Sequence, residues 1–317
     1  MTTAAVGNRA VATAGPAADD AEATATRERP RNRENGPGWA FVAPLVVFFA
    51  LFLVWPLIHG LYLSFTDQSM TGAGGAFVGL ANYAEAFADA EMWRALWNTV
   101  WFTLLSTVPL VLIALVMALL VEAGLPGKWL WRLSFFMPFL LASTVVSLIW
   151  VWIFNPQLGL VNSVLQSFGL AAVPWLQDPT VSMISIVIAT VWWTVGFNFL
   201  LYLAAIQNIP EQQYEAASID GAGRWRKLWS VTLPQLAPTT MLIVILQILA
   251  SLKVFDQIYQ MMNQLVTPAT QSVVVYIFDT GFTGYRFGYA SAISYIFFAI
   301  VLIISLVQFR TNARRSA

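Results

Sequence analysis

The chain has 317 residues, of which 58% are hydrophobic and 10% charged, with sixteen basic and sixteen acidic side chains. A soluble domain carries about 25% charged residues, so this chain has too few to cover an apolar core with a wettable surface. Zero net charge argues against a nucleic-acid-binding protein, which needs a concentrated basic surface. Because cysteine is absent and His59 is the single histidine, we expect neither a catalytic residue nor a metal site.

Windows without charged residues predict six membrane-spanning helices, since a helical span needs about 20 mostly apolar residues. Runs such as 108–121 are apolar at every position, whereas the strands of a membrane barrel alternate apolar and polar residues. The window 257–278 is also uncharged, but it holds too many polar side chains to lie in lipid. We therefore expect an all-α integral membrane domain over 39–310, with spans at about 39–62, 95–121, 133–154, 181–206, 236–257 and 288–309.

The positions of the basic residues orient these spans. Thirteen of the sixteen Lys and Arg residues fall in the N-terminal tail, in the loops after spans 2 and 4, and at the C-terminus. Since cytoplasmic segments are enriched in Lys and Arg, both termini are predicted to be cytoplasmic. Residues 1–38 have no apolar stretch, so we expect a disordered cytoplasmic tail rather than a signal peptide. Residues 311–317 are predicted to form a second, short cytoplasmic tail.

The cytoplasmic loop over 207–234 is expected to contain a short helix of its own. Pro210 suits the first turn of a helix, where its missing N–H costs nothing, and Gly221 is typical of a helix end. Ala216 and Ala217 leave a thin surface that another protein can approach closely. The loop is long for a connection between adjacent helices, which favours an interaction surface over a simple connector.

This loop also resembles the EAA loop of bacterial ABC importer permeases. The sequence Glu215-Ala216-Ala217 is followed after three residues by Gly221, and after nine more by Val231-Thr232-Leu233-Pro234. The spacing agrees with the family pattern throughout, and Val231 in place of isoleucine is the one departure. Segments 77–83 and 287–292 resemble the maltose-type carbohydrate importers, and Trp55-Pro56-Leu57 resembles their first permease subunit.

The resemblance implies the type I permease fold, with a cytoplasmic coupling helix, in the inner or plasma membrane of a bacterium. Besides the lipid bilayer, it implies three kinds of protein partner and no nucleic acid: a second permease subunit, two cytoplasmic ATPase subunits and an extracytoplasmic solute-binding protein. ATP and Mg²⁺ would bind to the ATPase, with no cofactor on this chain, because Gly124–Lys128 lacks the pattern of a phosphate-binding loop. The ATPase-coupling positions that it implies are Glu215, Ala216, Ala217, Asp220 and Gly221.

Span 4 offers the main candidates for a substrate pathway. Thr190, Trp193, Thr194 and Phe197 share one helical face, and an aromatic platform beside hydroxyl groups suits a sugar. The resemblance places substrate contacts of the maltose type at these four positions and on span 5. The alternative is helix packing, in which Thr and Ser join neighbouring helices. The predicted substrate-pathway residues are Thr190, Trp193, Thr194, Phe197, Asn198, Gln247 and Ser251.

Two charged residues, Lys253 and Asp256, lie near the outer end of span 5. Their spacing of three is that of neighbours on a helix, so they are expected to form either an interfacial ion pair or a contact in an outer vestibule. Taken together, the sequence predicts a non-enzymatic pore subunit of an ATP-driven importer for a sugar or oligosaccharide. The alternatives are an importer permease for a non-sugar solute such as a glycerophosphodiester, and a self-sufficient secondary transporter.

Overall fold

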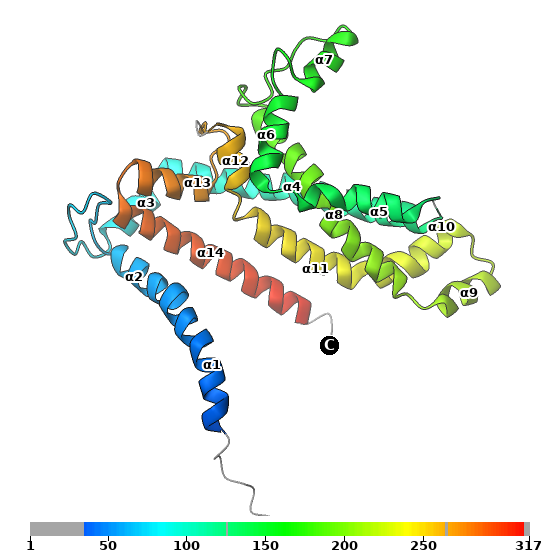
Figure 1. Ribbon diagram of the computed structural model, residues 1–317, viewed down its shortest axis with the longest axis horizontal. Helices are drawn as coiled ribbons and strands as arrows, with labels where there is room; N and C mark the ends of the chain where they lie inside the picture. Colours follow the sequence, from blue (N-terminus) through cyan, green and yellow to red (C-terminus); the bar gives the residue numbers. More distant parts are fainter. Residues whose placement is uncertain (1–34, 125, 264–265, 314–317) are drawn as a thin grey trace, which may run out of the picture. The chain divides into compact units, whose positions relative to one another are not determined.

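The computed structural model describes residues 35–124, 126–263 and 266–313, and the chain divides into two units, 1–56 and 57–317. All regular elements in these described residues are helices, which confirms the predicted all-α class (Figure 1). Most of the two predicted tails lies outside the described residues, and α1 begins at Asn35, ahead of the expected start at 39. The helices are α1 Asn35–Phe49, α2 Trp55–Leu63, α3 Ala81–Ala88, α4 Ala90–Glu122, α5 Lys128–Phe136, α6 Ser143–Ile153, α7 Leu160–Ser167, α8 Ser182–Gln207, α9 Glu211–Ile219, α10 Arg224–Lys227, α11 Leu233–Ser251, α12 Asp256–Met261, α13 Val273–Phe278 and α14 Phe287–Ala313.

Helices long and apolar enough to cross a membrane occur at five places in the described chain, and a bent pair makes a sixth candidate. Short π-helical turns join some of the pieces, so that α1 continues into α2 and α10 continues into α11. The five continuous stretches are Phe41–Leu63, Ala90–Glu122, Ser182–Gln207, Arg224–Ser251 and Phe287–Arg310.

The third predicted span, 133–154, is bent rather than continuous. Helix α5 and the 3-10 turn Met137–Leu140 form one arm, α6 forms the other, and the two arms meet at 99°. Pro138 lacks the N–H that would continue the helical ladder, and Leu141 and Ala142 take extended backbone angles. Hydropathy alone cannot detect this break, because both arms are apolar.

The fifth span also differs from the prediction of 236–257. The helical stretch already begins at Arg224 and ends at Ser251, and the chain leaves the helix at Leu252–Phe255 before α12 starts at Asp256. The uncharged window 257–278, excluded as a span, folds into α12, α13 and the loop between them. This segment is tied to the bundle where the Ser272 hydroxyl donates to the Val254 carbonyl, at 2.8 Å.

Helices α4, α8 and α11 form the centre of the second unit. One face of α4 carries a buried stripe of small and hydroxyl residues at spacings of three and four, which allows α8 to approach closely. Three hydroxyls in the stripe, those of Thr99, Thr103 and Ser106, donate to carbonyls of the same helix, at 2.8–3.4 Å. Across the bundle, Tyr202 of α8 donates to Thr240 of α11 at 3.0 Å. The three helices therefore form a packed core.

Asn162 organises the loop between α6 and α8, which contains α7. Its side chain is 1% exposed and makes four hydrogen bonds: two accepted, from the Val173 N–H and the Trp175 indole, and two donated, to the carbonyls of Pro156 and Val173. These bonds bring the two ends of the loop together.

Replacing Asn162 with leucine, a side chain of similar size, is expected to destabilise this loop by at least about 2 kcal/mol, because buried polar partners then lose their hydrogen bonds. Limited proteolysis between residues 155 and 180 measures the effect, and the variant should be cleaved faster. Ser163→Ala is the control, since the Ser163 hydroxyl bonds only to the Gly159 carbonyl of its own helix. Equal cleavage rates for the two variants would contradict the assigned role of Asn162.

Candidate functional site

Helix α9 is the structured part of the predicted cytoplasmic loop. Pro210 precedes its first residue, and Glu211 places an acidic group in its first turn, which the helix dipole favours. Its C-terminal end is closed by two hydrogen bonds, from the Gly221 N–H to the Ser218 carbonyl and from the Ala222 N–H to the Ala217 carbonyl. Gly221 has a φ of 75°, the left-handed conformation that this end requires and that glycine adopts without strain.

One face of α9 forms hydrogen bonds with the helix that follows it. The hydroxyls of Tyr214 and Thr232 are 3.0 Å apart, and Gln235 Nε2 donates to Gln213 Oε1 at 3.1 Å. Lys227 Nζ donates to the Ser218 hydroxyl at 2.5 Å. Three side-chain contacts along the element connect α9 to the continuous stretch Arg224–Ser251.

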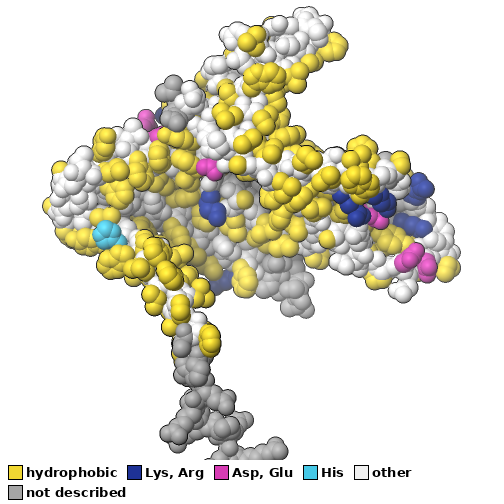
Figure 2. Space-filling view, viewed as in Figure 1, with side chains coloured by type: hydrophobic (Ala, Val, Ile, Leu, Met, Phe, Trp, Pro, Cys, Tyr) yellow, Lys and Arg dark blue, Asp and Glu magenta, His cyan; other side chains and the backbone are white. Residues whose placement is uncertain are grey.

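The face of α9 that points away from the stretch Arg224–Ser251 is mostly exposed. Glu215, Ala216 and Asp220 are exposed, Ala217 is half-buried, and Ile219 is 87% exposed. Figure 2 shows acidic side chains over α9 and basic side chains over α10 and α5 nearby. An exposed isoleucine beside carboxylates and small alanines is a surface that suits a protein partner of complementary shape and charge.

A second site is a cavity of about 310 Å³ among α4, α8 and α11. It brings together five of the seven predicted substrate-pathway residues: Thr190, Trp193, Thr194, Gln247 and Ser251. It is also lined by residues that the prediction of the pathway left out, namely Ser106 of α4 and Lys253, Asp256 and Gln257 beyond the end of α11. Gln257 belongs to the polar window excluded as a span, so the same polar residues that ruled out lipid contact could have indicated the cavity.

The other two predicted pathway residues lie elsewhere. Phe197 stacks on Phe139 of the turn before the bend, with ring centroids 5.2 Å apart. Asn198 is fully buried and accepts a hydrogen bond from Gln247 Nε2 at 3.0 Å, so it orients Gln247 without lining the cavity. The helical periodicity of α8 is as predicted, but Phe139 of the 3-10 turn covers Phe197 on that face.

Hydrogen bonding inside the helices fixes what the cavity offers a ligand. Thr190, Thr194 and Ser251 each donate their hydroxyl proton to a carbonyl of their own helix, at 2.7–2.8 Å. The Trp193 indole N–H donates to the Leu141 carbonyl at 3.1 Å. These groups therefore present oxygen lone pairs and an aromatic ring, which can accept hydrogen bonds from ligand hydroxyls and pack against apolar ligand faces.

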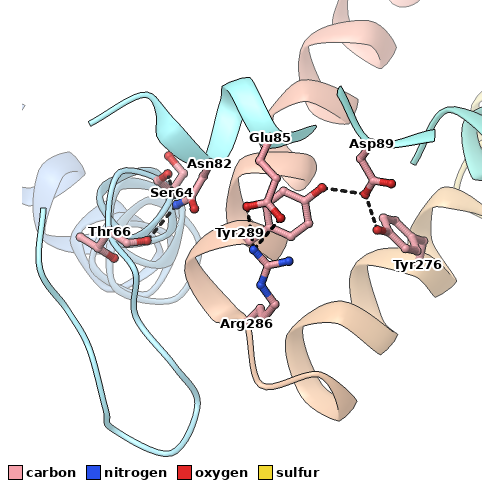
Figure 3. A network of polar contacts seen from close by, with 8 residues as sticks. All are labelled: Ser64, Thr66, Asn82, Glu85, Asp89, Tyr276, Arg286 and Tyr289. Atoms are coloured by element: carbon pink, nitrogen blue, oxygen red, sulfur yellow. Dashed lines mark hydrogen bonds and ion pairs between the residues drawn. The ribbon is translucent and has the colours of Figure 1, made fainter. Parts of the chain in front are cut away.

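On the side of the membrane that the sequence predicts to be the outer one, a polar network joins the ends of the helices (Figure 3). Asp89 accepts hydrogen bonds from the hydroxyls of Tyr276, at 2.5 Å, and Tyr289, at 2.7 Å. Arg286 binds Glu85 through two contacts of 2.7 Å. The network thus links the region of α3 to α13 and α14.

The two segments that resembled the maltose-type importers meet at this network. Asn82, in the first segment, donates to the carbonyls of Ser64 and Thr66, at 2.9 and 2.8 Å. Gly288, in the second, passes so close to the Thr66 carbonyl that an added Cβ would overlap it. Both sequence signatures therefore serve the same packing contact, which explains why these residue types occur there.

Protonation of Asp89 is expected to make the stability of this outer network depend on pH. Burial alone would raise its pKa, but the hydrogen bonds from Tyr276, Tyr289 and the backbone of Glu91 and Met92 outweigh burial and hold the pKa below its ordinary value. A carboxylate with a depressed folded-state pKa contributes stability that is present above its unfolded pKa, about 3.9, and is lost as the pH falls through the folded value.

We expect hydrogen exchange at the outer helix ends to be constant from pH 8 to about 5, after correction for the intrinsic rates, and to accelerate below about pH 4. Asp89→Ala should remove this acid step and exchange faster throughout, because it also removes the acceptor for the Glu91 N–H at the start of α4. Glu91→Gln should keep the step. An unchanged acid step in Asp89→Ala would assign it to another group.

Comparisons with known proteins agree with this geometry. Residues 86–316 match the family described as binding-protein-dependent transport system inner membrane component. The sulfoquinovosyl glycerol transport system permease protein SmoG of Agrobacterium fabrum is 32% identical, over 85% of this chain and 88% of its own. The sn-glycerol-3-phosphate transport system permease protein UgpA of the same organism is also 32% identical, over 87% and 94%. A crystal structure of a bacterial ABC transporter involved in the import of the acidic polysaccharide alginate aligns with a TM-score of 0.79 at 25% identity, over 88% of this chain and 96% of the matched chain.

Proposed function

Because the chain belongs to the family of binding-protein-dependent transport system inner membrane components, we propose that it is one of two pore-forming subunits of an ATP-driven importer for a sugar or oligosaccharide. The main observation that supports this proposal is the cavity, whose acceptor oxygens and Trp193 ring suit a polyhydroxylated solute. The relatives named for sulfoquinovosyl glycerol and alginate support a carbohydrate. The relative named for sn-glycerol-3-phosphate supports a phosphorylated polyol as the second candidate.

In this proposal the exposed face of α9 docks onto a cytoplasmic ATPase subunit. Glu215, Ala216, Ala217, Asp220 and Gly221 form the docking positions, with a mechanical and electrostatic role and no bond-making. ATP and Mg²⁺ bind to the two ATPase subunits, and this chain binds no cofactor.

The contacts between α9 and the stretch Arg224–Ser251 support the coupling step. That stretch is continuous from beside α9 to Gln247 and Ser251 in the cavity, so closure of the ATPase can reach the solute site through one helix. A second permease subunit completes the pore, and an extracytoplasmic binding protein delivers the solute. A secondary transporter would leave the open face of α9 without a role.

The orientation is part of the proposal. With both termini in the cytoplasm, α9 faces the cytoplasm, while the Asp89 network and the break after α11 lie on the outer side of the membrane. The thirteen basic residues in the predicted cytoplasmic segments support this placement.

Uptake by the complete transporter in proteoliposomes tests the proposed function. The vesicles would contain this chain, its second permease subunit and the ATPase, with the binding protein added outside and radiolabelled oligosaccharides as probes. We expect uptake that requires both ATP inside and the binding protein outside. Uptake driven by an ion gradient without ATP would instead identify a secondary transporter.

A further inference from the structure

We propose that Lys253 makes the cavity selective for a solute that carries an acidic group, such as a phosphate, sulfonate or carboxylate, beside its hydroxyl groups. This inference rests on the proposed import function and adds the chemical class of the solute. It assigns a role to Lys253, for which the sequence allowed two alternatives, an interfacial ion pair or a contact in an outer vestibule.

The break at the end of α11 places Lys253 on the cavity. The helix ends at Ser251, and Lys253 follows in the turn, where its N–H donates to the Ala250 carbonyl at 3.2 Å. Its side chain is exposed and lines the same cavity as Trp193 and Gln247. The carbonyl end of α11 favours a positive charge at this position.

The ammonium of Lys253 is not neutralised by a neighbouring carboxylate. In the part of the chain that the structure describes, the ion pairs are Lys128–Glu122 and Arg286–Glu85, so the first of the two alternatives for Lys253, an ion pair with Asp256, does not occur. Asp256 lies in the first turn of α12, beyond the break, and its Oδ2 accepts a hydrogen bond from the Ser143 hydroxyl of α6 at 3.3 Å. The cavity therefore presents separate positive and negative groups.

The hydrogen-bond donors and acceptors in the cavity determine which chemical groups of a ligand can bind there. The hydroxyls of Thr190, Thr194 and Ser251 and the Trp193 indole have already donated their protons, so they offer a ligand acceptors or a ring. The Asp256 carboxylate is likewise an acceptor, which suits the hydroxyl groups of a sugar. The oxygens of an acidic group need donors: the amides of Gln247 and Gln257 offer neutral ones, and Lys253 adds three N–H donors together with the positive charge.

Substitutions at Lys253 separate charge from size. Lys253→Gln removes the charge and keeps two donors, while Lys253→Arg keeps the charge. Arg94→Gln is the matched control, because it removes an exposed positive charge at the outer end of α4 without lining the cavity. The paired probes are digalacturonate against galactobiose, and sn-glycerol-3-phosphate against glycerol.

The assay is ATP-dependent uptake of each probe by the complete transporter with its binding protein. Because the binding protein is the same in every assay, a change in the ratio between variants reports on the cavity. We expect the wild type to import at least one acidic probe, and Lys253→Gln to reduce that uptake about tenfold or more relative to Arg94→Gln, which corresponds to about 1.4 kcal/mol. Lys253→Arg should retain most of the uptake, and the acidic probe that enters identifies the acid as carboxylate or phosphate.

Two results would overturn the inference while leaving an importer in place: uptake of the neutral probes only, or uptake of an acidic probe that Lys253→Gln leaves unchanged. An equal loss for acidic and neutral probes would also overturn it, since Lys253 would then be needed for folding or gating rather than for charge recognition. If the wild type imports none of the four probes while hydrolysing ATP, the proposed import of sugars and polyols fails, and this inference fails with it.

Discussion

Glu215→Lys is expected to abolish ATP-driven uptake, to less than about one hundredth of the wild-type rate, and to release the ATPase from the membrane subunits. Glu215 is exposed on α9, so the change should cost the isolated chain no more than about 0.5 kcal/mol. At a docked surface, however, the reversed charge faces a charge of the same sign on the partner, which makes the binding free energy less favourable by several kcal/mol. The loss should therefore be one of association and not of folding, and copurification of the ATPase with the tagged chain measures it.

Glu91→Lys is the matched control for this variant. Glu91 is also exposed, but it lies at the start of α4, beside the outer network. The same charge reversal there should leave ATPase copurification unchanged. If Glu215→Lys kept both copurification and uptake at wild-type values, the docking role of α9 would be wrong.

Gly196→Ala is expected to destabilise the membrane domain strongly, because the added methyl group has no room against α5. An added Cβ at Gly196 would overlap the Phe135 carbonyl oxygen and lie 2.9 Å from the Phe136 Cα, both backbone atoms of α5. The ring of Phe135 packs edge-on against Phe199 of α8, at 5.4 Å between centroids, so α5 cannot shift without losing that contact. Overpacking of this kind costs about 1–3 kcal/mol or more.

Thermal unfolding in detergent, followed by size-exclusion chromatography, measures the effect of Gly196→Ala. A loss of about 3 kcal/mol corresponds to roughly 6–12 °C in the unfolding temperature. Gly223→Ala makes the same chemical change where no heavy atom lies within 4 Å and φ is −70°, so it should unfold at the wild-type temperature. Equal unfolding temperatures for the two variants would show that α5 does not pack on α8 as described.

Local chemistry was enough to predict α9 and its ends. Pro210 and Gly221 act within their own turns, so the position of the helix does not depend on distant contacts. The number of apolar segments also follows from composition, because charged groups are too costly in lipid and the polar side chains of 257–278 exclude that uncharged window. These parts of the fold depend on properties that each short stretch of sequence carries by itself.

The bend and the cavity depend on contacts between distant segments. The 99° turn requires extended angles at Leu141 and Ala142, which hydropathy does not report. Periodicity correctly grouped Thr190 with Trp193, but it could not show that Phe139 covers Phe197. The spacing of Lys253 and Asp256 suggested neighbours on one helix, and this was wrong because α11 ends at Ser251, before Lys253, and α12 begins at Asp256.

The most direct test of coupling through α9 uses the absence of cysteine from the chain. Ala216→Cys places one thiol on the exposed face of α9, and Thr71→Cys places one on an exposed outer loop as the control. Each variant, assembled in the active transporter, would be treated with a short reagent that links a thiol to a nearby amine. We predict a product with the combined mass of this chain and one ATPase subunit from Ala216→Cys alone, in a yield that changes when ATP is added. No such product from Ala216→Cys in an assembled, active transporter would contradict docking through α9.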